Sequence, residues 1–244
     1  MLVSHTKKFI YTKTKKTAGT SVESYFEKYC LLEGTWEFFH NRPAYVGETG
    51  IIGYRGGKPP KGEVWRNHMP AKKIKRIVGD EIWNSYFKFC VIRDPFDKMV
   101  SGFHFYYRRK QRYALTNKLN AAANRLIGKS KPIDRVSGSH KVDRFRSWVK
   151  LGGWVKDRNK YIIDGQECVD FFIRFEDLEG GIRSVCERLE IPFEPERIPR
   201  LKHGNRIDDL PLNEYYDKET IQIVSDRYRF ELDRFGYTAP EPCQ

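Results

Sequence analysis

Short apolar runs alternate along the chain with segments whose apolar residues recur at helical spacing. Residues 9–11 form a short β-prone run, and residues 20–29 carry apolar side chains three and four positions apart, as on one face of a helix. A stronger buried strand is predicted over residues 86–92 and ends at Arg93, where an Asp-Pro pair breaks it. A helix is then expected over residues 96–109.

The same pattern continues to the end of the chain. Further predicted elements are a helix over residues 70–78, a hairpin over residues 161–169 with an Asp-Gly turn, a strand over residues 171–175, a helix from Gly180 or Gly181 to Leu189, and a last helix over residues 220–235. Strands alternate with helices, and the strongest strands are continuous apolar runs. This predicts an α/β fold with a central parallel sheet flanked by helices on both faces.

The length of 244 residues suits one compact domain spanning residues 1–244, and no internal repeat is visible. Residues 108–146 contain many Lys and Arg with fewer apolar anchors. We therefore expect a basic helical or loop insertion around residues 108–160.

The chain is strongly basic, with a formal net charge of +13. This excess predicts attraction to anions such as nucleotides, acidic glycans, nucleic acid or an anionic membrane, although a plain solvated basic surface is equally compatible with it. The five cysteines include no CxxC pair or Cys/His cluster, so no metal is expected and a reducing compartment fits best. No signal peptide or apolar run of about 20 residues is present, which predicts a soluble, cytoplasmic protein.

Small and hydroxyl-bearing residues occupy the predicted turn between the first strand and helix. The segment contains Lys16, Thr17, Ala18, Gly19, Thr20 and Ser21. Backbone amides and the helix dipole attract anions at such a helix start, small residues permit close approach, and a lysine and hydroxyls can donate to phosphate oxygens. The segment therefore predicts a phosphate-binding loop.

Two alternatives compete with this interpretation of the loop. The ATP-type pattern GxxxxGK[ST] is absent, which disfavours a kinase or ATPase. An ordinary helix start capped by Thr20 would also produce this sequence.

A second segment of interest begins where the strongest strand ends. Arg93 offers a fork of donors for a phosphate, and Ser101 can add a hydroxyl from the first turns of the following helix. An Arg paired with Asp94 or Asp97 at a helix start is the simpler alternative.

Together these two segments resemble the PAPS-dependent sulfotransferases, most closely the carbohydrate branch of Golgi-type and bacterial enzymes. That family has a 5′-phosphosulfate loop PKTxGTS and a 3′-phosphate element RxPxxRxxSxY. This chain departs from these patterns at Lys15, Lys98 and Phe103, which replace Pro, Arg and Tyr. The resemblance extends through residues 67–71, 175–178 and 235–237, and implies a P-loop-like sulfotransferase fold.

The resemblance also implies the donor PAPS (3′-phosphoadenosine 5′-phosphosulfate) and the residues that bind it. Residues 16–21 would hold the 5′-phosphosulfate, and Arg93 and Ser101 the 3′-phosphate. Lys202 and Arg206 belong to a basic loop that in the family closes over the 3′-phosphate end. An ordinary solvated loop would have the same basic sequence pattern. Lys16 would also be catalytic by stabilising the leaving phosphate during in-line displacement.

His68 is the leading candidate for the base that accepts the proton of the acceptor hydroxyl. It lies between a predicted strand over residues 64–66 and the helix starting at Pro70, and a neutral imidazole suits proton abstraction near pH 7. A capping or packing role remains open for it. Glu63 is a carboxylate alternative, and His104 is a weaker candidate beside the 3′-phosphate element.

The expected function is transfer of a sulfonate from PAPS to an acceptor hydroxyl on a carbohydrate, which the basic surface would allow to be anionic. A divergent P-loop kinase and a basic nucleic-acid-binding protein are the alternatives. The chain has no recognition helix or aromatic RNA-binding motif, so no specific nucleic acid is expected.

Overall fold

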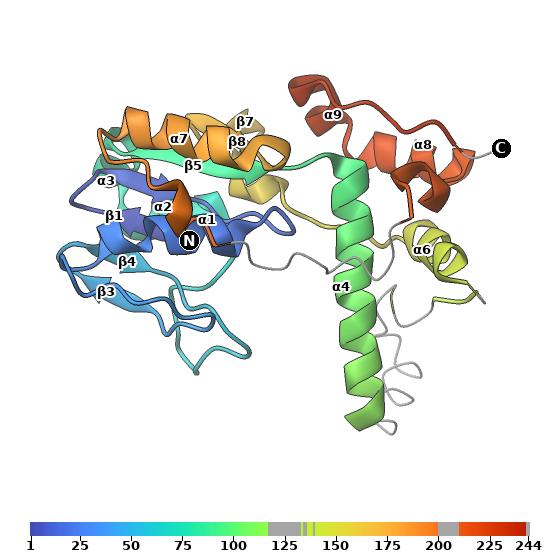
Figure 1. The fold of residues 1–244 in the computed structure, drawn as a ribbon, viewed down its shortest axis with the longest axis horizontal. Helices are drawn as coiled ribbons and strands as arrows, with labels where there is room; N and C mark the ends of the chain where they lie inside the picture. The colour runs from blue at the N-terminus through green and yellow to red at the C-terminus, as the bar shows by residue number, and fades with distance from the viewer. Residues whose placement is uncertain (117–132, 134–135, 139, 200–209, 243–244) are drawn as a thin grey trace. The chain divides into compact units, whose positions relative to one another are not determined.

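The computed structural model describes residues 1–116, 133, 136–138, 140–199 and 210–242, with the backbone alone for residues 112–116. The chain divides into two compact units (Figure 1). The first comprises Met1–Arg93 and Lys156–Leu201, and the second Asp94–Val155 and Lys202–Gln244.

A mixed sheet of six strands forms the centre of the first unit. Its strands are β1 (Leu2–Ser4), β2 (Phe9–Tyr11), β3 (Tyr45–Gly47), β4 (Gly50–Ile52), β5 (Phe87–Ile92) and β8 (Phe171–Arg174), in the order β3-β4-β1-β2-β5-β8. The pairs β2–β5 and β5–β8 are parallel. The pairs β1–β2, β1–β4 and β3–β4 are antiparallel.

The prediction of a parallel sheet is therefore wrong for three of the five strand pairs, while the α/β class is confirmed. The reason is the length of the connections. Residues 5–8 join β1 to β2, and residues 48–49 join β3 to β4. Such short links permit only antiparallel neighbours, whereas β2 and β5 are separated by crossover segments long enough for parallel pairing.

Helices cover both faces of this sheet, as predicted. One face packs against α1 (Gly19–Phe26) and α7 (Leu178–Arg188), with Phe9, Phe89 and Ile173 in the shared core. The opposite face packs against α2 (Ala71–Val78) and α3 (Asp80–Ser85) around Val3 and Ile10. Neighbouring strand residues alternate between the two cores because side chains alternate across a strand.

Several other predicted elements of the first unit can be compared with the structure. The hairpin is confirmed as β6 (Ile162–Ile163) and β7 (Gln166–Glu167), with Asp164 and Gly165 at φ 49° and 86°. These angles are typical of the type I′ turn that an Asp-Gly pair favours. The strand expected over residues 64–66 is not formed; Arg66 makes only an isolated bridge with Tyr54. Short 3₁₀ helices cover Glu27–Cys30, Arg158–Lys160, Phe175–Asp177 and Pro195–Arg197.

The second unit is helical in the part that is described. It contains α4 (Pro95–Thr116), α6 (Lys141–Lys150), a 3₁₀ helix at Leu212–Tyr215, α8 (Lys218–Arg227) and α9 (Arg229–Phe235). Its core joins aromatic side chains of α4 and α6 to Tyr215, Tyr216 and Tyr228. The predicted last helix is thus present but divided at Tyr228.

Candidate anion-binding loop and catalytic residues

The loop of residues 12–18, between β2 and α1, is anchored to the neighbouring strand β5. The Thr12 amide donates to the carbonyl of Phe89 at 3.0 Å, and the Thr14 hydroxyl donates to the carbonyl of Val91 at 2.5 Å. The hydroxyls of Thr14 and Thr17 lie 2.8 Å apart, so the Thr17 side chain is held inside the loop. The strand–loop–helix unit predicted from the sequence is confirmed in its geometry.

The backbone of this loop contains two left-handed residues at the start of α1. Lys16 and Ala18 have left-handed backbone angles, with φ of 61° and 52°, and Ala18 is the N-cap of the helix. No described residue accepts a hydrogen bond from the amides of residues 17–20. Amides arranged in this way at a helix N-terminus form a concave binding site for an anion.

Gly19 is needed because the loop folds tightly against its own beginning. A Cβ atom at this position would lie 3.0 Å from Cγ of Lys13 and 3.2 Å from the carbonyl oxygen of Thr14. Any larger residue would push the loop away from Lys13 and change the direction of the amides.

Two side chains from distant segments hold the outer part of the loop. Arg93, directly after β5, donates from Nη1 to the carbonyl of Lys16 at 2.7 Å, and its guanidinium stacks 4.0 Å from the ring centre of Phe175. The buried Asp157 carboxylate accepts the Lys15 amide through both oxygens, at 3.0 and 2.9 Å. Arg93 and Lys16 were both candidates from the sequence, and the structure brings them together.

A buried ion-pair network lies behind the loop. Lys13 and Arg55 each contact Oε2 of Glu23 at 2.6 Å, and Arg55 also pairs with Glu27. Lys13 Nζ is in addition 3.3 Å from the hydroxyl oxygen of Thr20. Burial alone would raise the pKa of Glu23, but Lys13, the Met1 amino group and Arg55 hold it well below its ordinary range, so the carboxylate stays charged.

His68 lies beside this network, in a left-handed turn (φ 56°) before α2. Its Nδ1 is 3.1 Å from the carbonyl oxygen of Lys13. A carbonyl only accepts, so Nδ1 carries the proton and Nε2 is left with a lone pair. Burial, the Lys13 charge and the Met1 amino group lower the pKa of His68 to about 3, which keeps the imidazole neutral at pH 7.

The two other candidate bases have partners of their own. Oε1 of Glu63 accepts the Trp65 amide at 2.9 Å. In the second unit, His104 is buried on α4 with Nε2 2.8 Å from the Tyr215 hydroxyl, which is a packing arrangement within the helical core. Among the contacts of the described residues, that of His68 with Lys13 is the one that joins a candidate base to the loop.

The remaining predicted cofactor residues are not brought to the loop by any described contact. Ser101 lies on α4, in the second unit. Lys202 and Arg206 lie outside the described residues. Their assignment to the cofactor stays a prediction from the sequence.

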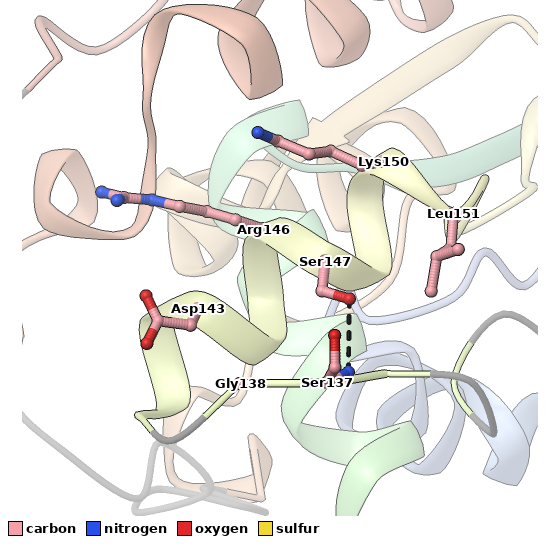
Figure 2. A pocket seen from close by; sticks show the side chains of 7 residues that line it. All are labelled: Ser137, Gly138, Asp143, Arg146, Ser147, Lys150 and Leu151. Atoms are coloured by element: carbon pink, nitrogen blue, oxygen red, sulfur yellow. Dashed lines mark hydrogen bonds between the residues drawn. The ribbon is translucent and has the colours of Figure 1, made fainter.

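An open depression on the second unit is lined mainly by polar and charged residues, among them Asp143, Arg146 and Lys150 (Figure 2). The Ser137 amide donates to the Ser147 hydroxyl at its floor, at 3.3 Å. Its two cations are already engaged, because Arg146 donates to backbone carbonyls and Lys150 pairs with Glu219 at 2.6 Å. This depression is therefore a poorer anion site than the loop at Lys16.

Sequence reasoning missed the residues that support the loop. Asp157 is 142 positions from Lys15, and no local pattern points to that contact. Lys13 is close in sequence to Lys15 and Lys16, so the sequence does not say which of the three lysines is buried. Glu23 gave a signal that could have been used, since it shares a helix face with Gly19 and Phe26 and is a charged residue on a buried helix.

The first unit is thus an α/β structure with an anion-binding strand–loop–helix element, and comparison with known proteins identifies its family. The model of the sulfotransferase family matches residues 1–238 of the chain. The chain belongs to the sulfotransferase family, and is by that membership a transferase.

A relative of unknown function supports no finer assignment. A curated protein of Archaeoglobus fulgidus, named only as an uncharacterized protein, is 25% identical over 132 residues, which cover 52% of this chain and 86% of that protein. No solved structure matches the chain significantly. None of the described helices combines the length and the apolar character required to cross a membrane.

Proposed function

We propose that the protein transfers a sulfonate group from PAPS to an acceptor hydroxyl, on a P-loop-like sulfotransferase fold. The observation that carries the proposal is the loop of residues 16–21 between β2 and α1, in which no described residue accepts from the amides of residues 17–20. Membership of the sulfotransferase family supports sulfonate transfer over the kinase and nucleic-acid alternatives.

The donor set of the loop fits a 5′-phosphosulfate group. Backbone amides, hydroxyls and a lysine all donate, and no described carboxylate faces these amides. Bound PAPS would supply the sulfonate and a bisphosphate leaving group. The amides of residues 17–20 would hold the phosphosulfate oxygens, and the Lys16 ammonium would stabilise the negative charge that develops on the leaving oxygen.

His68 would accept the proton of the acceptor hydroxyl at Nε2. Its Nδ1 bond to the Lys13 carbonyl fixes the required tautomer. A proton acceptor works best when its pKa is near the working pH, and a pKa of about 3 is low for that role. An anion held on the adjacent loop would offset the positive charge of Lys13 and raise the pKa of His68, so binding of the donor would activate the base.

Arg93 is the proposed 3′-phosphate ligand for which the structure provides support. Its side chain is held in place by the Lys16 carbonyl and by Phe175. For Ser101, Lys202 and Arg206 the proposal rests on the sequence resemblance alone.

The finer properties of the enzyme rest on composition and family pattern. A carbohydrate acceptor follows from the resemblance to the carbohydrate branch, and the net charge of +13 would favour an anionic one. The described cysteines Cys30, Cys90, Cys168 and Cys186 are free, which supports a reducing, cytoplasmic location. A single domain over residues 1–244 is supported by one family model that matches residues 1–238.

A transfer assay tests the proposal. Purified protein is incubated with ³⁵S-labelled PAPS and a panel of neutral and anionic saccharides, and labelled products are separated by chromatography. We expect a labelled saccharide with the wild-type chain, and a loss of kcat of roughly 10²–10³-fold in Lys16→Met. Lys28→Met, which removes a half-buried lysine paired with Glu194, is the control. Equal turnover in Lys16→Met and Lys28→Met would contradict the assignment of Lys16.

A further inference from the structure

Lys13 contacts both the phosphate-binding loop and His68, the proposed base. Its side chain makes the first contact and its backbone carbonyl the second. Its ammonium group is 3.3 Å from Oγ1 of Thr20 in the phosphate-binding loop, and its carbonyl oxygen is 3.1 Å from Nδ1 of His68. The side chain is almost completely buried, with 2% exposed, and is therefore not available to a ligand arriving from solvent.

Each contact has only one possible direction. An ammonium group can only donate, so Thr20 Oγ1 accepts from Lys13 and the hydroxyl proton of Thr20 is left to donate elsewhere. A carbonyl can only accept, so His68 donates from Nδ1 and keeps the lone pair on Nε2. Lys13 thus makes Thr20 a donor, as an anionic oxygen requires, and His68 an acceptor, as a hydroxyl proton requires.

The buried carboxylate of Glu23 keeps Lys13 in this position. Glu23 Oε2 lies 2.6 Å from Lys13 Nζ and also 2.6 Å from Nη1 of Arg55. A buried lysine without such a partner would lose its charge or move to solvent. Gly19 closes over the Lys13 stem, where even a Cβ atom would crowd Cγ at 3.0 Å.

We propose that Lys13, held by Glu23, is a positioning residue that sets the hydrogen-bond direction of Thr20 in the phosphate loop and of His68. This inference rests on the proposed function, because it gives the two groups their roles in sulfonate transfer. It assigns to Lys13 no contact with the donor or the acceptor.

The charged groups around His68 are those of the same network. Lys13 and the Met1 amino group act against the imidazolium form, and Glu23 acts in its favour. Replacement of Lys13 by a neutral residue removes the larger of the two opposing charges, so protonated His68 becomes easier to form.

The test compares Lys13→Met, Glu23→Gln and the control Lys28→Met, after circular dichroism has shown that each is folded. Adenosine 3′,5′-bisphosphate is titrated calorimetrically, and the His68 ring nitrogens are observed by ¹⁵N NMR between pH 3 and 8, with His68→Gln to assign the signals. We expect the wild type to show the Nδ1–H tautomer at pH 7. Lys13→Met removes the positive charge beside His68 and should raise the pKa of His68. The variant keeps the backbone carbonyl but loses the Glu23 ion pair that holds residue 13, so the Nδ1–H tautomer should also become less dominant, whereas Lys28→Met should leave both unchanged.

Binding provides a second, independent readout. Thr20→Val should weaken bisphosphate binding about tenfold, and Lys13→Met should do the same. The double variant should be no weaker than either single one, because Lys13 acts on the bisphosphate only through the Thr20 hydroxyl. If Lys13→Met does not fold, Glu23→Gln is used in its place. It frees the Lys13 side chain, so bisphosphate binding should again weaken, but it removes a charge that favours protonated His68, so the pKa of His68 should fall and not rise.

The possible failures are distinguishable. Unchanged His68 spectra together with unchanged bisphosphate affinity in a folded Lys13→Met or Glu23→Gln variant would overturn the inference and leave the proposed function standing. A wild-type chain that does not bind the bisphosphate would overturn the proposed function, while the ring-nitrogen spectra would still decide whether Lys13 controls His68.

Discussion

The imidazole Nδ1 of His68 lies 3.1 Å from the carbonyl oxygen of Lys13, although the two residues are 55 positions apart in the chain. This contact joins the turn before α2 to the loop that precedes α1. It connects the best candidate for a base with the best candidate for an anion-binding site. The proposed transfer of the acceptor proton to His68 depends on this link.

The first prediction concerns acid stability. The folded-state pKa of His68, about 3, is below the ordinary value of 6.5, so between these values the unfolded chain binds more protons at His68 than the folded chain. The contribution of neutral His68 to the free energy of unfolding is therefore lost as the pH falls from 6.5 toward 3. His68→Gln removes the titrating group. As the pH falls from 6.5 to 4, the free energy of unfolding of this variant should therefore decrease by on the order of 2 kcal/mol less than that of the wild type.

Urea unfolding at closely spaced pH values measures this difference. Glu23 is present in both proteins, so its own contribution, which is complete above its ordinary pKa and falls in acid, cancels in the comparison. Parallel stability curves for His68→Gln and the wild type would show that His68 is not held in its neutral form.

The second prediction concerns the tight turn of the loop. Gly19→Ala adds a Cβ atom 3.0 Å from Cγ of Lys13, and should lower stability by about 1–3 kcal/mol and weaken bisphosphate binding. The neighbouring Ala18→Gly relieves a left-handed backbone at φ 52°, and should raise stability by up to about 1 kcal/mol. Thermal unfolding of the pair measures both. Opposite signs are expected, and equal effects would contradict the loop geometry.

The third prediction concerns Arg93. Arg93→Lys keeps the charge but loses the planar fork that stacks on Phe175 and donates to the Lys16 carbonyl. Bisphosphate affinity should fall about tenfold by calorimetry. Arg183→Lys is the matched control. Arg183 lies on α7, away from the loop, and its guanidinium stacks 4.2 Å from the ring centre of Phe193. A similar loss in both variants would mean that general charge, and not Arg93, holds the ligand.

Elements with a strong local signal were predicted correctly from the sequence. The strand at residues 86–92 is a continuous apolar run and is present as β5. The Asp164–Gly165 turn has the one residue pair that most favours a type I′ hairpin. The loop at Lys16 was recognised because the amides of a strand–loop–helix connection bind anions whatever the rest of the fold.

The arrangement of the sheet could not be predicted in the same way. The strands β1, β3 and β4 have three residues each, too short for a periodic signal. Without them, β2 was taken as the first strand and the sheet as parallel. Pairing of β1 with β4 also joins segments some 48 residues apart, Leu2 with Ile52 among them, which no local pattern reveals.

The candidate site was predicted where its residues are consecutive and missed where they are distant. Residues 16–21 and Arg93 came from contiguous motifs. Asp157, Glu23 and Arg55 act through buried pairings between remote segments, and charged residues of this kind are ordinarily placed on the surface. Which residues pair within the supporting network of the loop is therefore knowable only from the folded structure.

Calorimetric titration with adenosine 3′,5′-bisphosphate tests the central claim most directly, because it needs no knowledge of the acceptor. We expect binding in the micromolar range for the wild-type chain, a loss of at least tenfold in Lys16→Met, and no change in Lys28→Met. Absence of heat from a wild-type chain that is folded by circular dichroism, or equal affinity in Lys16→Met, would contradict the assignment of this loop to the sulfonate donor.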